Sequence, residues 1–332
     1  MIGPKCASTR RLLTFHRPKS FLIFPIFLLN ILSADCWKSS APEARYTGLM
    51  RPRRLSTRPT SSVRHRSGAG EPLLLLHGFS SCAEAWMPIV PALERRHEVI
   101  AVTFHGHRGG PRLPATFGHT ISESADLAEA ELDAAGFGRV HIVGNSLGGW
   151  LAIELARRGR ALSVVALSPA GGWESGSAQQ RRVKGVFRRI RAALHVGGPL
   201  APLLARFAVS RRIALGNIVA RPERLTPAQA RTIIEASWKC DAFEGVLGAV
   251  EREPPPQPIH SIPCPIRIVW GSRDRILPMS GYSERWRAII PGAEWVELPG
   301  AGHVPMYDDP DGVARAILEV TSRASDARAV AQ

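Results

Sequence analysis

The sequence predicts an α/β protein, with a mostly parallel central sheet, helices on both faces of that sheet and an inserted helical segment. Three observations lead to this class. Short apolar runs suited to buried parallel strands alternate with segments of helical periodicity. A serine flanked by glycines, Gly144-Asn-Ser146-Leu-Gly148, stands between one apolar run and one helical pattern. Residues 171–255 then break the alternation before it resumes.

The predicted strands are short and rich in apolar, often β-branched residues. They lie at 63–66 (an edge strand), 72–76, 98–103, 140–143, 162–167, 266–270 and 294–298. Helical patterns separate them at 80–93, 122–135 (with Ser122 as N-cap), 150–157, 280–290 and 312–324. Because strands alternate with helices, the sheet should be parallel, and ligands should bind at the carboxyl ends of its strands. Gly78, Ser146 and Ser168 fall at those ends.

Residues 171–255 are expected to form an all-helical cap inserted between two parts of the core, 63–170 and 256–325. Residues 181–194 place one apolar stripe opposite several arginines: Val183, Val186, Phe187, Ile190 and Leu194. Residues 178–224 hold 11 Lys and Arg against one acidic residue. The arginine face of 181–191 suits a solvated helix surface, and the alternative is contact with a membrane or an acidic partner. Residues 326–332 are expected to be a polar tail.

The first 62 residues are expected to be a leader or a disordered basic segment. Basic residues precede a short apolar run at 21–32, which resembles an export signal, although its cleavage site is poor. Twelve residues are too few to span a bilayer comfortably. Residues 1–35 would make the protein exported or membrane-associated if they are a genuine leader. Translation from Met50 would instead give a cytoplasmic enzyme.

The net charge of +15 is concentrated in the N-terminal segment. Residues 1–66 hold 13 Lys and Arg against 2 Asp and Glu, which accounts for +11. This segment lacks interleaved aromatic residues and any recognised module, so nucleic acid is not an expected partner. The five cysteines are scattered without a C-x-x-C pair, and no H-E-x-x-H occurs. We therefore expect no metal and no cofactor; the oligomeric state stays open.

The segment around Ser146 has the form of a nucleophile elbow, G-x-S-x-G. A sharp turn from strand to helix lifts the serine oxygen clear of the sheet. Gly144 and Gly148 are needed because a Cβ atom would collide there. The backbone N–H of Leu147 then lies at a helix N-terminus, where negative charge is stabilised.

Two later strands end in the residues that an activated serine requires. The strand at 266–270 is followed by Gly-Ser-Arg-Asp274, and the strand at 294–298 by Pro-Gly-Ala-Gly-His303. The chain order Ser, Asp, His is the order that accompanies such an elbow. These three residues are the candidate catalytic triad.

With these motifs in place, residues 63–325 resemble the α/β-hydrolase fold superfamily. The matching segments are Leu-His77-Gly-Phe79, Gly144-Asn-Ser-Leu-Gly-Gly149, Gly271-Ser-Arg-Asp-Arg-Ile-Leu-Pro278 and Gly300-Ala-Gly-His-Val-Pro305. The resemblance implies a cofactor-free serine hydrolase acting on an ester or related carbonyl. Ser146 would be the nucleophile, His303 the base and Asp274 the group that orients it. The backbone N–H groups of Phe79 and Leu147 would form the oxyanion hole.

Other residues have structural interpretations that compete with functional ones. His77 is expected to pack beneath the oxyanion loop, and Cys82 to be a small buried side chain. His105 departs from the D-x-x-G-x-G pattern of similar proteins, so it and His107 are taken as loop residues. Asp308 and Asp309 look like a helix cap. An apolar pocket is expected from three aromatic residues, with cap packing as the alternative role: Trp173, Trp238 and Phe243.

Several alternatives share the same motifs. A dehalogenase or epoxide hydrolase with an aspartate nucleophile is disfavoured, because residue 146 is serine. A carbon–carbon bond hydrolase fits G-N-S-x-G-G, but that group usually carries Trp after the catalytic histidine, where this chain has Val304. A lactonase, a haloperoxidase-like enzyme and a non-catalytic small-molecule binder stay open.

Overall fold

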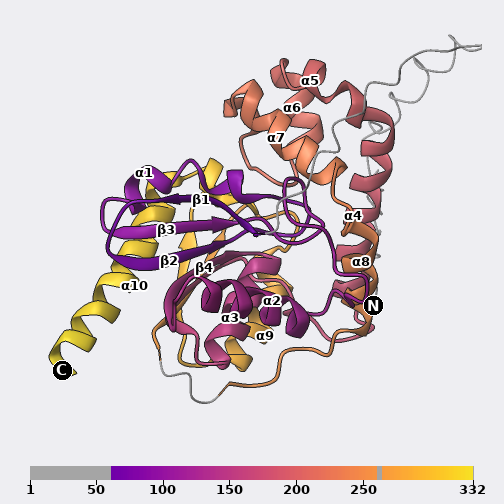
Figure 1. Cartoon of the computed structure of the whole chain (residues 1–332). Coiled ribbons are helices and arrows are strands. Elements are labelled where there is room, and N and C mark those ends of the chain that lie inside the picture. Colours follow the sequence, from indigo (N-terminus) through magenta and orange to yellow (C-terminus); the bar gives the residue numbers. More distant parts are fainter. Residues whose placement is uncertain (1–60, 260–263, 332) are drawn as a thin grey trace, which may run out of the picture. The chain divides into compact units, whose positions relative to one another are not determined.

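The computed structural model describes residues 61–259 and 264–331, and a seven-stranded sheet forms their centre (Figure 1). The strand order is β1-β3-β2-β4-β5-β6-β7. β1 runs antiparallel to β3, and every other neighbouring pair is parallel. The strands are β1 Val63–Ser67, β2 Glu71–Leu76, β3 His97–Val102, β4 Val140–Asn145, β5 Ala161–Leu167, β6 Ile266–Gly271 and β7 Glu294–Leu298. The predicted α/β class and edge strand are confirmed.

Helices cover both faces of this sheet, as alternating strands and helices require. Figure 1 shows α2, α3 and α9 on one side and α1 and α10 on the other. Their bounds are α1 Val90–Leu93, α2 Ile121–Ala134, α3 Leu147–Arg157, α9 Met279–Ile289 and α10 Pro310–Ala331. Short 3₁₀ turns lie at η1 Ala83–Trp86 and η4 Pro305–Tyr307. No helix in the described ranges is long and apolar enough to cross a membrane.

The two faces of β2 show how the sequence builds two cores. Leu74 and Leu76 belong to the apolar cluster that contains Leu151 of α3. Leu73 and Leu75 belong to the cluster that contains Ile317 of α10. Side chains alternate along a strand, so a strand buried on both faces needs an unbroken apolar run. The apolar run that predicts β2 is therefore explained by the burial of both faces of this strand.

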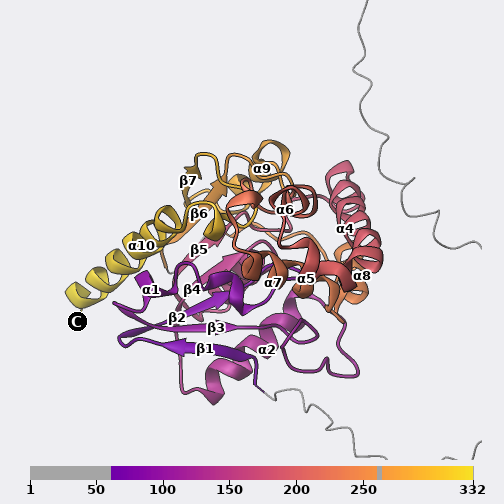
Figure 2. The ribbon, with the colours of Figure 1, turned by 90° about the horizontal axis from the view of Figure 1, so that it is seen from above.

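The cap segment, residues 171–255, consists mainly of helices. They are α4 Ala178–Gly197, η2 Gly198–Leu200, α5 Ala201–Leu204, α6 Ala208–Leu215, η3 Pro222–Arg224, α7 Pro227–Trp238 and α8 Phe243–Arg252. In both views α4 and α8 lie side by side, and α5, α6 and α7 form a group beyond the sheet (Figures 1 and 2). The division into core and cap stays a prediction, and the predicted leader lies outside the described residues except for 61 and 62.

Three details of the sequence prediction are wrong. Thr120, not Ser122, caps α2, because its side chain accepts from the Glu123 N–H while the Glu123 side chain accepts from the Thr120 N–H. Residues 80–93 form the 3₁₀ turn η1 and the single-turn helix α1 instead of one longer helix; Pro88, which has no N–H to donate, lies between them, and Pro91 lies in the first turn of α1, where proline is tolerated. Residues 326–331 continue α10 instead of forming a tail. Arg328 near its end pairs with Glu71 of β2.

Candidate active site

Ser146 stands at the turn from β4 into α3 with a strained backbone. Its φ is 54° and its ψ −114°, in a region that L-residues rarely adopt. The turn is crowded: a Cβ atom on Gly144 would lie 2.0 Å from the Gly148 carbonyl oxygen, and one on Gly148 2.2 Å from the Leu76 carbonyl oxygen. The Ser146 N–H donates to the Leu167 carbonyl at 2.9 Å, which fixes the turn to β5.

Asp274 and His303 come together at the carboxyl ends of β6 and β7. His303 Nδ1 lies 2.7 Å from Asp274 Oδ2, and both side chains are buried. Asp274 Oδ1 accepts the backbone N–H groups of Ile276 at 2.9 Å and Leu277 at 2.8 Å. With Asp274 ionised, its oxygens only accept, so Nδ1 of His303 carries the proton. A neutral His303 then has its lone pair on Nε2, the nitrogen that a base would use.

Ser146 and His303 line the same pocket, together with Phe79. Its free volume is about 50 Å³. Most of its walls are apolar and come from the cap segment and from loops at the sheet edge: Phe187, Ile190, Ile218, Ile233, Ile276, Val304 and Tyr307. Phe187 and Ile190 belong to the apolar stripe that the sequence placed on α4. The pocket therefore suits a small, largely apolar molecule.

None of the three aromatic residues expected to line this pocket does so. Trp173 packs in the core between Trp150 and Tyr282, with ring centroids 6.4 and 6.3 Å apart. Phe243 is fully buried behind Phe79, at 4.9 Å between ring centroids. Trp238 covers Gly198, where a Cβ atom would lie 2.6 Å from the indole. Aromatic residues in a helical cap can pack inside the cap or line a pocket. Which of these two positions they take depends on how the helices pack.

Phe79 and Leu147 lie where backbone donors can face this pocket. Phe79 directly follows Gly78 in the turn after β2, and Leu147 is the first residue of α3. Neither backbone N–H forms a backbone hydrogen bond within the described part of the chain. A helix N-terminus also favours negative charge. The two N–H groups are therefore available to an oxygen that develops negative charge near Ser146.

Asn145 connects the turn at Ser146 to the loop that carries His303, which we call the histidine loop. The sequence did not predict this role. Its Nδ2 donates to the Leu167 carbonyl at 3.2 Å and to the His303 carbonyl at 2.9 Å. The side chain is buried, so it contributes two hydrogen bonds that water cannot replace. The available signal was its position directly before Ser146 at the end of an apolar strand.

Asp308 is a second residue whose role differs from the prediction. Asp309, not Asp308, caps α10, with Oδ1 accepting from the Gly312 N–H at 3.0 Å. Asp308 instead accepts the backbone N–H groups of Ala220, Arg221 and Gly302 at 2.8–3.0 Å. It therefore ties the cap segment to the residue that precedes His303.

His77 and Cys82 have the structural roles expected of them. His77 Nδ1 contacts the Gly78 carbonyl at 2.7 Å, and the Phe104 N–H donates to its Nε2 at 3.1 Å. Burial lowers the pKa of His77 well below its ordinary value, so the ring is neutral at pH 7. Cys82 is buried, and burial raises its thiol pKa to about 12, which leaves the thiol unreactive. Among the described residues, no three His, Cys, Asp or Glu gather where they could hold a metal.

The fold and this site place the chain among known proteins. Residues 73–316 match the model of the alpha/beta hydrolase family, and the chain belongs to that family.

Individual relatives have diverse names. The chain is 36% identical over 194 residues to the epoxide hydrolase EphH of Mycobacterium tuberculosis, covering 58% of this chain and 91% of the relative. It is 29% identical over 245 residues to the putative carbamate hydrolase RutD of Klebsiella pneumoniae, covering 73% and 88%. A thermophilic esterase from Thermogutta terrifontis superposes with a TM-score of 0.61 at 23% identity, covering 78% of this chain and 92% of that one. At that identity the likeness shows the fold alone.

Proposed function

We propose that the protein is a serine hydrolase that cleaves a small apolar ester, or a related carbonyl compound, through an acyl-enzyme. The observation that carries this proposal is the buried Asp274–His303 hydrogen bond at 2.7 Å, in a pocket shared with the strained Ser146. A serine hydroxyl is a weak nucleophile without a base, and His303 supplies a lone pair in the same pocket.

In the first half-reaction the Ser146 oxygen attacks the carbonyl carbon while His303 Nε2 takes its proton. The carbonyl oxygen becomes an oxyanion, which the N–H groups of Phe79 and Leu147 stabilise. When this intermediate collapses, the bond to the alcohol breaks and His303 returns a proton to the departing oxygen. Asp274 stabilises the imidazolium in between. In the second half-reaction water attacks the acyl-enzyme by the same steps and releases the acid.

The names of relatives support hydrolysis of small molecules more than any one substrate. An epoxide hydrolase and a haloalkane dehalogenase are among them, together with a carbamate hydrolase. Ser146 favours acyl transfer in this chain, because an acyl-serine ester is readily hydrolysed, whereas the alkyl-serine ether that an epoxide would give is not.

The test is labelling of the full chain with a fluorophosphonate, beside hydrolysis of p-nitrophenyl acetate and hexanoate. Ser146→Ala should abolish labelling and lower the hydrolysis rate by at least about 10³-fold. Ser168→Ala is the matched control, because Ser168 is also a buried serine with positive φ (44°) after a strand, outside the pocket. Wild-type protein that is folded but unlabelled, or a Ser146→Ala variant that keeps its activity, would overturn the proposal.

We also propose that the cap segment contacts an anionic lipid surface. Six large apolar residues of the cap segment, which we call the apolar patch, are 48–72% exposed: Val196, Leu200, Leu203, Phe207, Val209 and Ile213. Val196, Leu200 and Leu203 lie in the consecutive helical segments α4, η2 and α5 at steps of four and three residues, as on one side of successive helical turns, and Phe207 follows in extended backbone. Exposed apolar patches of this kind mark interaction surfaces.

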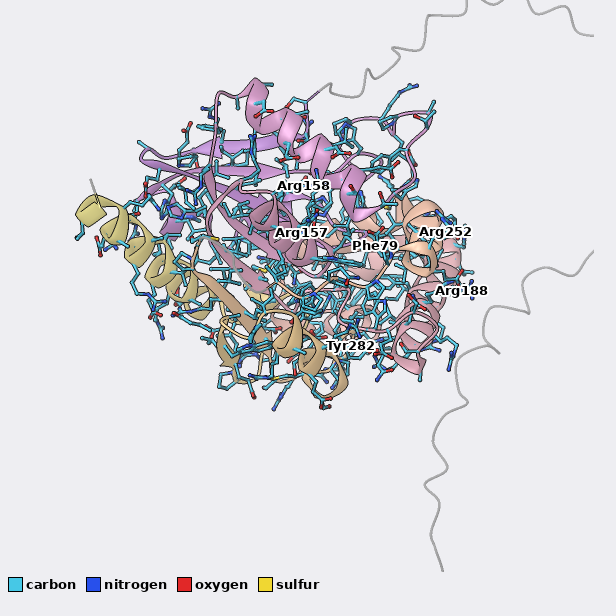
Figure 3. All side chains as sticks on the ribbon, turned by 90° about the horizontal axis from the view of Figure 1, so that it is seen from below. Phe79, Arg157, Arg158, Arg188, Arg252 and Tyr282 are labelled. Carbon is cyan, nitrogen blue, oxygen red and sulfur yellow. The ribbon has the colours of Figure 1, made fainter. Side chains whose placement is uncertain are left out.

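Charge favours lipid as the partner of the apolar patch. Arg206 and Arg212 lie within its sequence, and Arg188 lies at the outer side of α4 (Figure 3). Basic residues beside exposed apolar ones suit anionic headgroups above an acyl layer.

Co-sedimentation with vesicles tests this contact. The protein should bind phosphatidylcholine vesicles that contain phosphatidylglycerol, less so at high salt, and the double variant Phe207→Ser/Ile213→Ser should lose binding. Val330→Ser is the control, because Val330 is 89% exposed on α10. Unchanged vesicle binding by the double variant would contradict the proposal. A double variant whose oligomeric state differs from that of the wild type in light scattering would also contradict it, because the apolar patch would then mediate self-association.

A further inference from the structure

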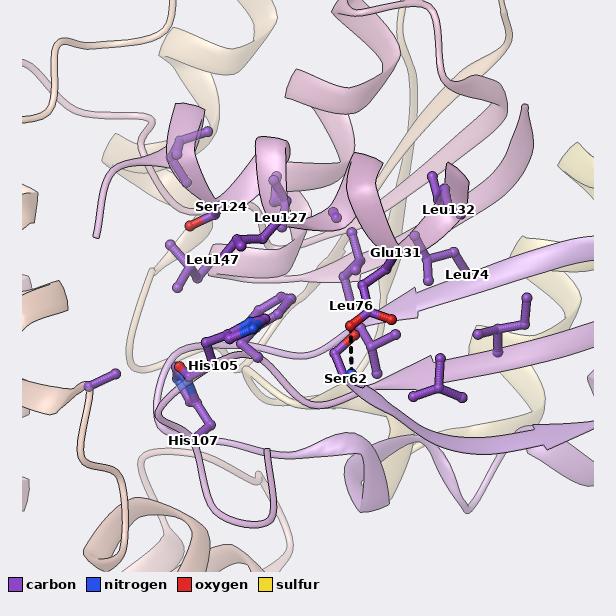
Figure 4. A pocket seen from close by; sticks show the side chains of 18 of the residues that line it. Ser62, Leu74, Leu76, His105, His107, Ser124, Leu127, Glu131, Leu132 and Leu147 are labelled. Atoms are coloured by element: carbon purple, nitrogen blue, oxygen red, sulfur yellow. Dashed lines mark hydrogen bonds between the residues drawn. The ribbon is translucent and has the colours of Figure 1, made fainter. Parts of the chain in front are cut away.

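A second cavity lies between α2 and the sheet, apart from the pocket of Ser146 (Figure 4). We call it the α2 cavity. Strands β1–β3 form one wall, α2 the opposite wall, and the loop after β3 one end. Its free volume is about 80 Å³, several times the roughly 10–15 Å³ that one water needs. The side chains thus leave a real gap in what is otherwise a packed face of the sheet.

Most of the walls of the α2 cavity are apolar. They include Leu74, Leu76, Ile100, Val102, Ile121, Leu127, Ala128, Leu132, Phe137, Leu147 and Leu151. The polar lining is largely satisfied: the Glu131 carboxylate accepts the Ser62 N–H at 2.7 Å and the Ser61 hydroxyl at 3.1 Å. Apolar cavities gain little from water and bind apolar molecules of matching size. The apolar walls are therefore suited to a ligand with a hydrocarbon chain.

His107 adds one specific polar feature to the α2 cavity. Its Nδ1 lies 3.2 Å from the His105 carbonyl, which can only accept, so Nδ1 carries the proton. Burial lowers the pKa of His107 to about 4, so the ring is neutral at pH 7. Nε2 is then an acceptor, and it is buried without a hydrogen-bond partner among residues 61–259 and 264–331. A buried acceptor of this kind calls for a donor from outside the protein.

In the described part of the chain, His119 is the other cavity residue with a buried ring nitrogen, Nδ1, that has no hydrogen-bond partner. Its side chain packs against Gly245 of α8, where a Cβ atom would lie 2.1 Å from Nε2, and against Phe117 at 5.0 Å between ring centroids. His119 is only partly buried, whereas His107 is 3% exposed. His107 is therefore the better-defined acceptor.

We propose that the α2 cavity is a binding site for a short aliphatic alcohol, whose chain lies along the leucines and whose hydroxyl donates to His107 Nε2. A carboxylate is disfavoured, because it brings no proton for Nε2 and because Arg66, the arginine of the lining, is already paired with Glu98 at 2.6 Å. In Figure 4 Leu147 borders the part of the cavity near His105 and His107, and Leu74 and Leu132 lie toward the other part. The bound alcohol would thus lie next to the side chain of Leu147, the residue that directly follows Ser146.

The site does not depend on the proposed hydrolase activity, so it is tested with the unmodified protein and with Ile233→Trp, which fills the pocket of Ser146 and leaves the lining of the α2 cavity unchanged. The probes are 1-hexanol and pentyl methyl ether, which matches it in length but has no O–H. Calorimetry should show binding of 1-hexanol at least tenfold tighter than of the ether. In ¹⁵N-histidine spectra of the same protein, the Nε2 resonance of His107 should shift with 1-hexanol and stay unchanged with the ether.

Two variants test separately how the hydrocarbon part and the hydroxyl group of the alcohol contribute to binding. Ala128→Phe fills the cavity and should remove 1-hexanol binding. His107→Phe should remove the preference for alcohol over ether and leave weak binding of both. Equal binding of the two probes by wild type, or no shift of the His107 resonance, would overturn the proposal even if a variant fails to fold. Binding of 1-hexanol that disappears in Ile233→Trp would also overturn it, because the alcohol would then occupy the pocket of Ser146.

Discussion

Ser146 can adopt its strained conformation because its glycine neighbours have no side chains. Its φ of 54° turns the chain from β4 into α3 within one residue. That turn brings α3 close to β2, so that a Cβ atom on Gly148 would approach two backbone carbonyls, Leu76 at 2.2 Å and His77 at 2.6 Å. Backbone atoms in the middle of a packed sheet cannot move aside cheaply. The glycine requirement is thus a property of packing as much as of backbone freedom.

Gly148→Ala is expected to destabilise the protein by more than about 4 kcal/mol, since a core overlap of this size forces α3 away from the sheet. Gly138→Ala is the control, because a Cβ atom there meets nothing within 4 Å and its φ is not positive. It should change the free energy of unfolding by less than about 0.5 kcal/mol. Urea denaturation of both variants measures the difference. A Gly148→Ala protein that is as stable as the control would contradict the close packing of α3 against β2.

At the level of elements, the residue that follows η4 connects the cap segment to the loop that carries His303, two parts of the chain that are distant in sequence. Asp308, at the end of η4, receives N–H groups from Ala220 and Arg221 of the cap segment and from Gly302 before His303. Charge-assisted hydrogen bonds to a carboxylate are stronger than neutral ones. This one side chain therefore positions the histidine loop relative to the cap segment.

Asp308→Ala should cost about 2–4 kcal/mol of stability, because it leaves three backbone N–H groups without their partner. It should also lower ester hydrolysis by displacing His303. Asp309→Ala removes only the cap of α10 and should cost about 1 kcal/mol, with activity kept. Thermal unfolding and p-nitrophenyl acetate hydrolysis of the two variants measure the contrast. Equal effects of the two substitutions would show that Asp308 is only a helix cap.

At the scale of the whole molecule, buried neutral histidines make stability depend on pH. Burial lowers the pKa of His107 and of His141 to about 4, and that of His77 well below its ordinary value. The unfolded chain binds protons at these residues near pH 6.5, whereas the folded protein does not until the pH falls much further. Their contribution to stability is therefore full above about pH 7 and is lost as the pH falls toward 4.

The free energy of unfolding should be lower at pH 5 than at pH 7.5 by about 2 kcal/mol for each of these histidines. Urea denaturation at the two pH values measures the difference. His141→Gln should reduce this difference, because one of the three histidines is gone. A free energy of unfolding that does not change between pH 7.5 and 5 would contradict the burial of the three rings.

Local sequence patterns are enough to predict the class of fold and the positions of polar residues that directly follow the strands. Apolar runs predict buried strands because such strands have no polar face. Gly144-Asn-Ser146-Leu-Gly148 predicts a strand-to-helix turn because other residues would collide in it. Asp274 and His303 were found for the same reason: each directly follows a strand, and parallel strands bring those ends to one edge.

Which side chains line the pocket and which fill the core depends on the packing of the folded chain. An aromatic side chain is suited both to a pocket wall and to a core. The residue type alone therefore does not predict where such a side chain lies, as the positions of Trp173, Trp238 and Phe243 show. Asn145 donates to backbone carbonyls at least 22 residues away along the chain, and two of the N–H groups that Asp308 accepts are 87 and 88 residues away. No local pattern encodes such contacts. The α2 cavity is likewise a gap between elements that each show ordinary periodicity. Local patterns follow from backbone geometry, whereas cavities and long-range hydrogen bonds depend on how the elements pack.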